Sequence, residues 1–439
     1  MSRDRAKAKM HRYNKLPGEI ALAKKRPGAC LTAFRPPAGV WGQRPICTNL
    51  SHLSKAKIHV IMKKGDNMNI QDILNQLPEG YKEACWETKA MQRRKGIQNE
   101  DILLTLCLYY AYDKSLVDTK IYANTFLSVK ISDVGFMKRF TACNQWVRWM
   151  NQRLIEERQP IYDIPEKLKG KRIKTVDASD IVTKGAVKQT WHLHYAFDLF
   201  SFSSAEFHIT PECTGETLEN FTFQPNDLVI ADRAYATISG IEHCKRSGSD
   251  FVLRLRNKAF NLYDENGDRL ILTEDILKKT DCECQDFTVY YKSKKNKLTK
   301  LRLCVRRKTD DEIAAEQQKL DRKESRKQLK ISEDTRLSHN YFFVVTSLDE
   351  EYSCEEILAI YRLRWQVEMV FKRFKSILKM GSMPTKTAGS CETWLNCKML
   401  IALLIEKMLL SVDFPPYKHS TEFLAGNEDL IPFDFSLFF

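Results

Sequence analysis

The stretch that decides the fold is YRLRWQVEMVFKRFK, residues 361–375. Because a helix turns by about 100° per residue, Val367, Phe371 and Phe374 gather on one apolar face. An adjoining polar stripe, about 60° wide, holds Tyr361, Arg364, Glu368 and Lys375. Two further lysines extend this stripe at its edge, Lys372 and Lys379. The period predicts one helix over about 354–380 that packs on a core and presents a single acid among bases.

Glu368 is the unusual residue of this polar stripe. A basic stripe suits the phosphates of a polyanion, and a lone carboxylate within it would repel them. A divalent cation shared with other carboxylates resolves the conflict, because Mg²⁺ prefers carboxylate oxygens and bridges to phosphate. The alternative is an ordinary surface ion pair between Arg364 and Glu368, four residues apart. Periodicity alone favours the ion pair, so the choice depends on other acids in the chain.

Two aspartates follow β-rich runs elsewhere in the chain. The run 173–176 ends at Asp177, and the run 227–231 ends at Asp232. Loops at strand ends converge on one edge of an α/β sheet, where functional sites collect. Either aspartate alone is typical of a turn. Together with Glu368 they supply three carboxylates, which is what a two-metal phosphoryl-transfer site requires.

Three motifs in this order resemble a known family. The pattern Tyr-x2-Arg-x3-Glu-x6-Lys over residues 361–375 is similar to the Tyr-Arg-Glu-Lys signature of the insertion-sequence-four family of DDE transposases, at every spacing. VDAS at 176–179 resembles the strand of that family's first Asp, and IADRAY at 230–235 resembles its second-Asp motif. The resemblance covers about residues 95–410, and the motifs together are far more specific than any one alone.

The resemblance implies an α/β fold with an RNase H-like mixed sheet and flanking helices. It implies that the catalytic, metal-binding residues are Asp177, Asp232 and Glu368, with two Mg²⁺ (or Mn²⁺) ions as cofactors. The phosphate contacts that it implies, with the neighbouring bases of the stripe, are Tyr361, Arg364, Lys375, Arg233, Lys372 and Lys379. The expected partners are the inverted-repeat ends of a mobile element and target DNA, bound by a homodimer during cut-and-paste transposition.

Composition and periodicity divide the chain into segments. Helical spacing dominates before residue 165, β-rich runs follow, and a charged segment interrupts them. We expect a basic, disordered extension at 1–67, a helical DNA-binding domain at 68–165, a first core part at 166–256, a β-rich insertion at 257–340, a second core part at 341–412 and an irregular tail at 413–439. A helix-turn-helix reader and a plain helical bundle fit the helical segment equally well.

Charge and cysteine content constrain the function further. Residues 1–67 hold fifteen Lys or Arg and three Asp or Glu, so of the net charge of +14 only about +2 belongs to the rest. A run at 292–308 has nine basic residues and no acid, which favours contact with a DNA backbone over a merely solvated hairpin. No apolar run reaches the ~20 residues of a membrane span. We expect a cytoplasmic, nucleoid-associated bacterial protein whose 13 cysteines are reduced, mostly buried thiols.

Two other functions remain open from the sequence. One is a catalytically inactive, transposase-derived DNA-binding protein, or relic; inverted repeats flanking the coding region would argue against it. The other is a different RNase H-like nuclease, such as a junction resolvase. The β-rich insertion and the helical N-terminal segment count against the second alternative.

Overall fold

A computed structural model describes residues 73–158, 166–183, 190–211, 214–256, 259–280, 284–385 and 387–410. The expected basic extension at 1–67 and the expected irregular tail at 413–439 lie outside these ranges. None of the helices in the described part of the chain is long and apolar enough to cross a bilayer.

Short helices make up the region before the sheet. They are α3 (Tyr81–Glu87), α4 (Glu100–Ala111), α5 (Leu116–Phe126), α6 (Asp133–Ala142) and α7 (Asn144–Glu156). Side-chain caps fix where they begin: the Asn99 side chain accepts the Ile102 N–H, and the Ser132 hydroxyl accepts the Gly135 N–H. The helical character predicted for this region is confirmed for the residues that the structure describes.

A mixed sheet follows the helices. Its first part has the strand order β3-β2-β1-β4-β5-β10. The bounds are β1 (Arg172–Thr183), β2 (Thr190–Asp198), β3 (Ser203–Pro211), β4 (Asp227–Ala231), β5 (Asp250–Arg254) and β10 (Tyr341–Thr346). β1, β4 and β5 are parallel, whereas β2, β3 and β10 are antiparallel to their neighbours. The predicted α/β class with a mixed sheet is therefore confirmed.

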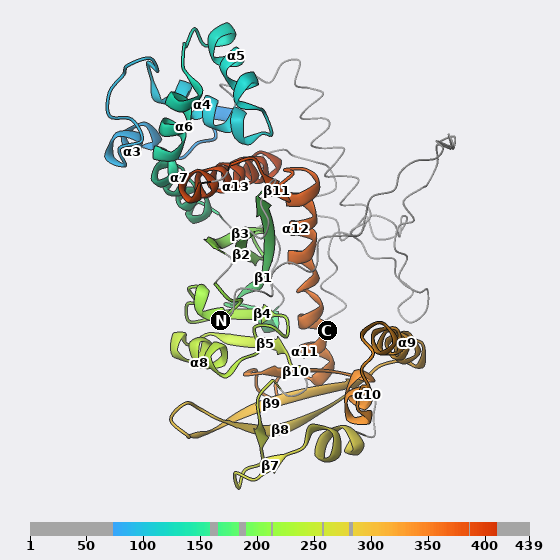
Figure 1. The fold of residues 1–439 in the computed structure, drawn as a ribbon. Coiled ribbons are helices and arrows are strands. Elements are labelled where there is room, and N and C mark those ends of the chain that lie inside the picture. Colours follow the sequence, from blue (N-terminus) through green and yellow to red (C-terminus); the bar gives the residue numbers. More distant parts are fainter. Residues whose placement is uncertain are drawn as a thin grey trace, which may run out of the picture. The chain divides into compact units, whose positions relative to one another are not determined.

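The strands of 257–340 extend this same sheet. Beyond β10 the order continues β9-β8-β6-β7. These strands are β6 (Leu262–Tyr263), β7 (Arg269–Leu270), β8 (Cys284–Lys292) and β9 (Leu298–Arg307). The charged helix α9 (Asp310–Lys327), closed at its start by a Thr309–Glu312 capping box, and α10 (Glu333–His339) then lead back to β10. The interruption in the sequence pattern is thus an enlargement of one sheet (Figure 1).

The two faces of the central strands carry separate cores because side chains alternate along a strand. One core joins Ile173, Leu228, Ile230 and Val344 to buried residues of α11 (Cys354–Arg362) and α12 (Trp365–Ser376). The other core includes Ile241 of α8 (Ile238–Ser247), on the opposite face. Polar side chains on the same face of the sheet as Ile173, Leu228 and Ile230 therefore point toward α11 and α12.

The single helix predicted over 354–380 is wrong; the structure has α11 and α12 with a break between them. At the break the N–H of Arg364 bonds to the Tyr361 carbonyl and the N–H of Val367 bonds to the Arg364 carbonyl. These are bonds to the third residue back, so a 3₁₀ turn interrupts the α-helical hydrogen-bond pattern. After α12, the Met380 N–H bonds to the Phe374 carbonyl and Lys379 adopts the left-handed conformation at φ 51°, which ends the helix.

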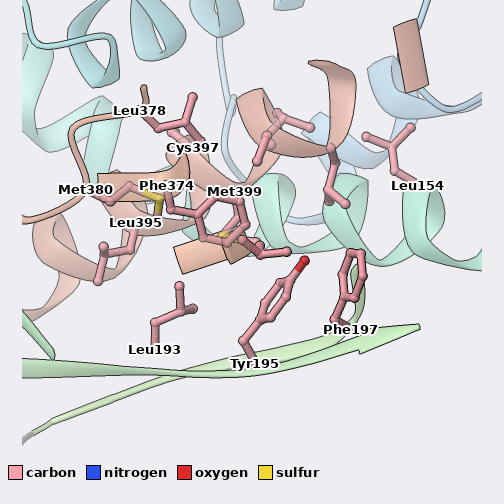
Figure 2. Close-up of a cluster of buried hydrophobic side chains, with 14 of the residues drawn as sticks. Leu154, Leu193, Tyr195, Phe197, Phe374, Leu378, Met380, Leu395, Cys397 and Met399 are labelled. Carbon is pink, nitrogen blue, oxygen red and sulfur yellow. The ribbon is translucent and has the colours of Figure 1, made fainter. Parts of the chain in front are cut away.

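Helix α13 (Ala388–Leu410) ties the N-terminal helices to α12 and the sheet. Figure 2 shows side chains from α7, β2, α12 and α13 packed into one cluster, among them Leu154, Leu193, Tyr195, Phe197, Phe374, Leu378, Leu395 and Met399. Polar contacts supplement this packing: the Asn151 side chain donates to the Asn396 carbonyl at 3.0 Å. These helices share one hydrophobic core.

A buried ion pair lies at the end of this cluster. The ammonium group of Lys398 on α13 is 1% exposed. It pairs with Asp113, in the turn between α4 and α5, at 3.0 Å. It also donates to the carbonyl of Leu378, just after α12, at 2.5 Å. Lys398 therefore connects three segments: the N-terminal helices, α12 and α13.

The cysteines are of two kinds in the described residues. Seven are free and buried, as predicted. The prediction that all are reduced thiols is wrong for Cys284 and Cys354, which form a disulfide between the starts of β8 and α11. The two residues are 70 positions apart, and the fold brings their Cα atoms to 6.3 Å. No local pattern could have paired them, because the pairing depends on how α11 packs against the enlarged sheet.

Candidate active site

The register of the sheet brings the two predicted aspartates side by side. β1 and β4 run parallel and Val176 pairs with Ala231, so Asp177 and Asp232 come next in their chains at the same level. β4 and β5 continue the register, which brings Arg254 to that level too. Since neighbouring strands lie about 4.8 Å apart, these three residues form a row across the sheet. The row is on the face that α11 and α12 cover.

Asp232 follows the last residue of β4, as predicted, but Asp177 does not end its strand. β1 continues to Thr183 because it pairs with β2 as far as Val182 and with β11 (Ser382–Met383) at its end. The backbone of Asp177 is therefore held by the sheet ladder, which gives its carboxylate a more rigid base than a loop would.

Arg364, in the break between α11 and α12, reaches toward all the predicted acids. Its guanidinium lies 2.5 Å from a carboxylate oxygen of Glu368 and 3.7 Å from one of Asp177. Burial lowers the pKa of Arg364. Its neighbours, Tyr361 and Glu368 foremost and then Asp232, more than reverse that shift and hold the pKa above its usual value. The predicted Arg364–Glu368 ion pair thus exists, and it belongs to a cluster with both aspartates.

The environment of Asp177 disfavours its charge. Burial raises the pKa of Asp177 to about 6, and the charges of Glu368 and Glu216 add to this effect. The Ala178 N–H, which donates to the Asp177 carboxylate at 2.9 Å, and the charge of Arg364 work in the opposite direction. Such a partly buried group of acids gains from any cation that reaches it.

Asp232 is held by a stack of aromatic and basic side chains. The Tyr361 hydroxyl donates to the Asp232 carboxylate at 3.3 Å, and the Arg254 guanidinium lies 3.8 Å from the same oxygen. The Phe342 ring contacts both partners, 5.0 Å from the Arg254 guanidinium and 5.2 Å from the Tyr361 ring. Sequence reasoning missed Arg254, which is the last residue of β5. No sequence pattern pointed to Glu216 as a residue of the site, because it lies in a loop after β3.

The remaining bases of the stripe differ in their surroundings. Lys375 and Lys372 are exposed on α12, and Lys372 lies over the Trp365 ring at 5.8 Å. Arg233 is exposed in the turn after β4. Lys379 does not belong to the helical stripe, because α12 ends at Ser376; it lies 3.8 Å from Asp113 instead.

The basic run at 292–308 is divided by the β8–β9 hairpin. Toward the base, Arg302 pairs with Asp286 at 2.6 Å and Arg306 pairs with Glu312 at 3.2 Å, so these charges stabilise the fold. Three lysines at the turn are exposed: Lys294, Lys295 and Lys297. We call these three residues the hairpin tip, which is available to a polyanion without breaking the internal pairs named here.

The acids are chemically suited to a metal but are not yet gathered around one position. Among the described residues, no three His, Cys, Asp or Glu side chains already stand as ligands of one ion. Carboxylate oxygens are nevertheless the donors that hard divalent cations take. The guanidinium of Arg364 contacts both Asp177 and Glu368.

Comparison with known proteins agrees with this geometry. Residues 168–404, which include the whole site, match the model of the family described as "Transposase DDE domain". The chain belongs to the transposase DDE-domain family. It is therefore an enzyme of phosphoryl transfer on DNA, a transposase of the kind that insertion sequences encode.

Relatives of this DDE transposase cover most of its length. It is 26% identical over 358 residues to the transposase for insertion sequence element IS421 of Escherichia coli, a match that spans 79% of this chain and 95% of that protein. It is 23% identical over 375 residues to the transposase for insertion sequence element IS231F of Bacillus thuringiensis subsp. israelensis, spanning 76% of this chain and 78% of the relative. The match begins well before the sheet, so the helical region is part of the similarity.

Proposed function

We propose that Asp177, Asp232 and Glu368 are the catalytic triad of this transposase, and that they bind two Mg²⁺ or Mn²⁺ ions. The observation that carries the proposal is the row of Asp177 and Asp232 on parallel strands, facing a helix that holds Glu368. The strand order β3-β2-β1-β4-β5 with β2 antiparallel agrees with an RNase H-like core, which we propose as the finer description of the fold.

The donor set fits the proposed ions. The three side chains offer carboxylate oxygens only, and burial makes the negative charge of Asp177 costly without a cation. Bound divalent ions would lower the pKa of an attacking water or 3′ hydroxyl and stabilise the leaving oxygen. The chain itself fixes the geometry, since the sheet ladder holds Asp177 and Tyr361 orients Asp232.

We propose that the bases around the triad bind the phosphates next to the scissile bond. Arg364 and Tyr361 would act closest to the chemistry, with Lys375, Lys372 and Arg233 farther along the strand. Lys379 is left out, because it lies beyond the end of α12 and faces Asp113. The hairpin tip would contact DNA more distantly and without sequence preference.

We propose cut-and-paste transposition by a homodimer on the inverted-repeat ends of its element. In this scheme residues 68–165 bind end DNA, 166–256 and 341–412 form the catalytic core, and 257–340 enlarge the sheet toward the hairpin tip. The basic extension at 1–67 would add non-specific affinity. Support for the scheme comes from the family and from the charge distribution along the chain.

Plasmid excision with the full chain tests this function. Wild-type protein with Mg²⁺ is expected to release a marked element bounded by its own repeats, while Asp177→Ala, Asp232→Ala and Glu368→Ala abolish cutting and still bind the ends. As a matched control, Glu219→Ala removes an exposed acid near Glu216 on the turn η3 (Leu218–Asn220) and keeps activity. Cutting that survives the triad changes would disprove the assignment, and end binding without excision by wild-type protein would indicate an inactive relative.

A further inference from the structure

The cation nearest the proposed triad belongs to the protein itself. The Arg364 side chain is 14% exposed, and its guanidinium contacts Glu368 and Asp177 at 2.5 Å and 3.7 Å. Asp232 lies in the same row as Asp177 and is paired with Arg254 at 3.8 Å, so Arg364 is the base that contacts the other two acids. The Arg364 charge therefore offsets part of the repulsion that these acids would otherwise exert on one another.

Arg364 and a divalent ion need the same oxygen atoms. Mg²⁺ demands close octahedral contact at about 2.0–2.1 Å, and the Glu368 oxygen that it would use is already held by the guanidinium. Two divalent ions would also bring four positive charges against about three negative ones, so a fixed Arg364 would then be repelled. Metal binding and the Arg364–carboxylate contacts therefore compete.

The position of Arg364 allows it to exchange partners. It lies in the 3₁₀ break between α11 and α12, as the N-cap of α12, and makes no side-chain capping bond there. Its Nε is buried and has no hydrogen-bond partner within the described part of the chain. The free protein thus leaves one donor of the guanidinium unused, whereas a phosphate can take two parallel N–H donors at once.

We propose that Arg364 is an internal competitor for the metal site: it holds the carboxylates in the DNA-free protein and moves to a DNA phosphate when the ions bind. This inference rests on the proposed function, since it takes the triad as the metal site. It makes metal and DNA binding reciprocal, so that each tightens the other. Strand cleavage would then be restricted to protein that already holds DNA.

Calorimetric titration of Mn²⁺ into the DNA-free full chain tests this exchange. Removing a competing cation is expected to tighten binding by about tenfold in Arg364→Ala, equivalent to about 1.4 kcal/mol, and similarly in the bulkier Arg364→Gln. Lys323→Ala, which removes an exposed cation from α9, is expected to bind Mn²⁺ as wild type does. Unchanged or weaker Mn²⁺ binding in both Arg364 variants would overturn the proposal and leave Arg364 as a residue that only orients Glu368.

Two further measurements separate this idea from the proposed function. A short duplex of arbitrary sequence is expected to tighten Mn²⁺ binding to wild-type protein but not to Arg364→Ala; equal tightening in both would count against the exchange. Adding Asp177→Asn and Asp232→Asn to Arg364→Ala is expected to abolish Mn²⁺ binding. Tight binding that persists in this triple variant would show that the ion lies elsewhere, which refutes the metal site itself.

Discussion

Asp113→Ala is expected to destabilise this transposase far more than an ordinary surface substitution does. Asp113 is 30% exposed and pairs with Lys398, whose side chain is 1% exposed. Burial lowers the pKa of Lys398, and the hydrogen bond and charge of Asp113 offset only part of that shift. Without Asp113 the buried ammonium keeps the Leu378 carbonyl as a partner but loses its counter-ion. The folded state then contains a buried charge that nothing neutralises.

The magnitude follows from the burial of the two partners. Breaking a buried ion pair by removing one side costs about 3–5 kcal/mol, and the partial exposure of Asp113 lowers this to about 3 kcal/mol. Lys398→Met is expected to cost only about 1 kcal/mol, since it removes the buried charge, which lies 4.8 Å from the Trp394 ring, and puts an apolar side chain of similar length in its place. The double variant should then resemble Lys398→Met, so the second change rescues about 2 kcal/mol of the first.

Urea unfolding of the four proteins, followed by fluorescence and extrapolated to water, measures these differences. Lys379→Ala serves as the control, because Lys379 contacts Asp113 at 3.8 Å from a side chain that is 70% exposed, and its loss should cost less than about 0.5 kcal/mol. A cost below about 1 kcal/mol for Asp113→Ala, or a larger cost for Lys398→Met, would refute the argument from a buried charge.

Three further predictions concern pH, DNA and the disulfide. Burial holds the pKa of His194 at about 4, below its usual 6.5. The free energy of unfolding that is present above pH 6.5 should therefore fall by about 3 kcal/mol as the pH drops toward 4. Urea titrations of His194→Gln should show a smaller loss of stability over this pH range, and an equal loss would refute the prediction. Alanine at all three lysines of the hairpin tip should reduce the slope of log DNA affinity against log salt concentration by about 2 to 3. An equal reduction in the control variant Lys323→Ala with Arg326→Ala on α9 would show that the effect is not specific to the hairpin tip. Cys284→Ser should lower the free energy of unfolding by up to about 4 kcal/mol, because the disulfide closes a loop of 70 residues, and dithiothreitol should bring the wild-type protein to the same value.

The sequence predicted most of what depends on neighbours along the chain. Helical spacing before residue 165 was a local signal of this kind, and in the structure Asn99 and Ser132 cap helices of that region. The Arg364–Glu368 contact was also predictable, because residues four apart meet on a helix. The break at Leu363 and Arg364 was not, since its helical dihedral angles leave the apolar period nearly intact.

By itself, the sequence supplied the three acids that we propose as the triad and their order, since the spacing of the signature and the two β-rich runs are local properties. Only the tertiary structure decided that Asp177 and Asp232 share one level, because that follows from the pairing of Val176 with Ala231 across parallel strands. Tertiary structure also added Arg254 to the row and joined Cys284 to Cys354. Contacts between distant segments depend on sheet register and helix packing, and no single stretch of sequence encodes either.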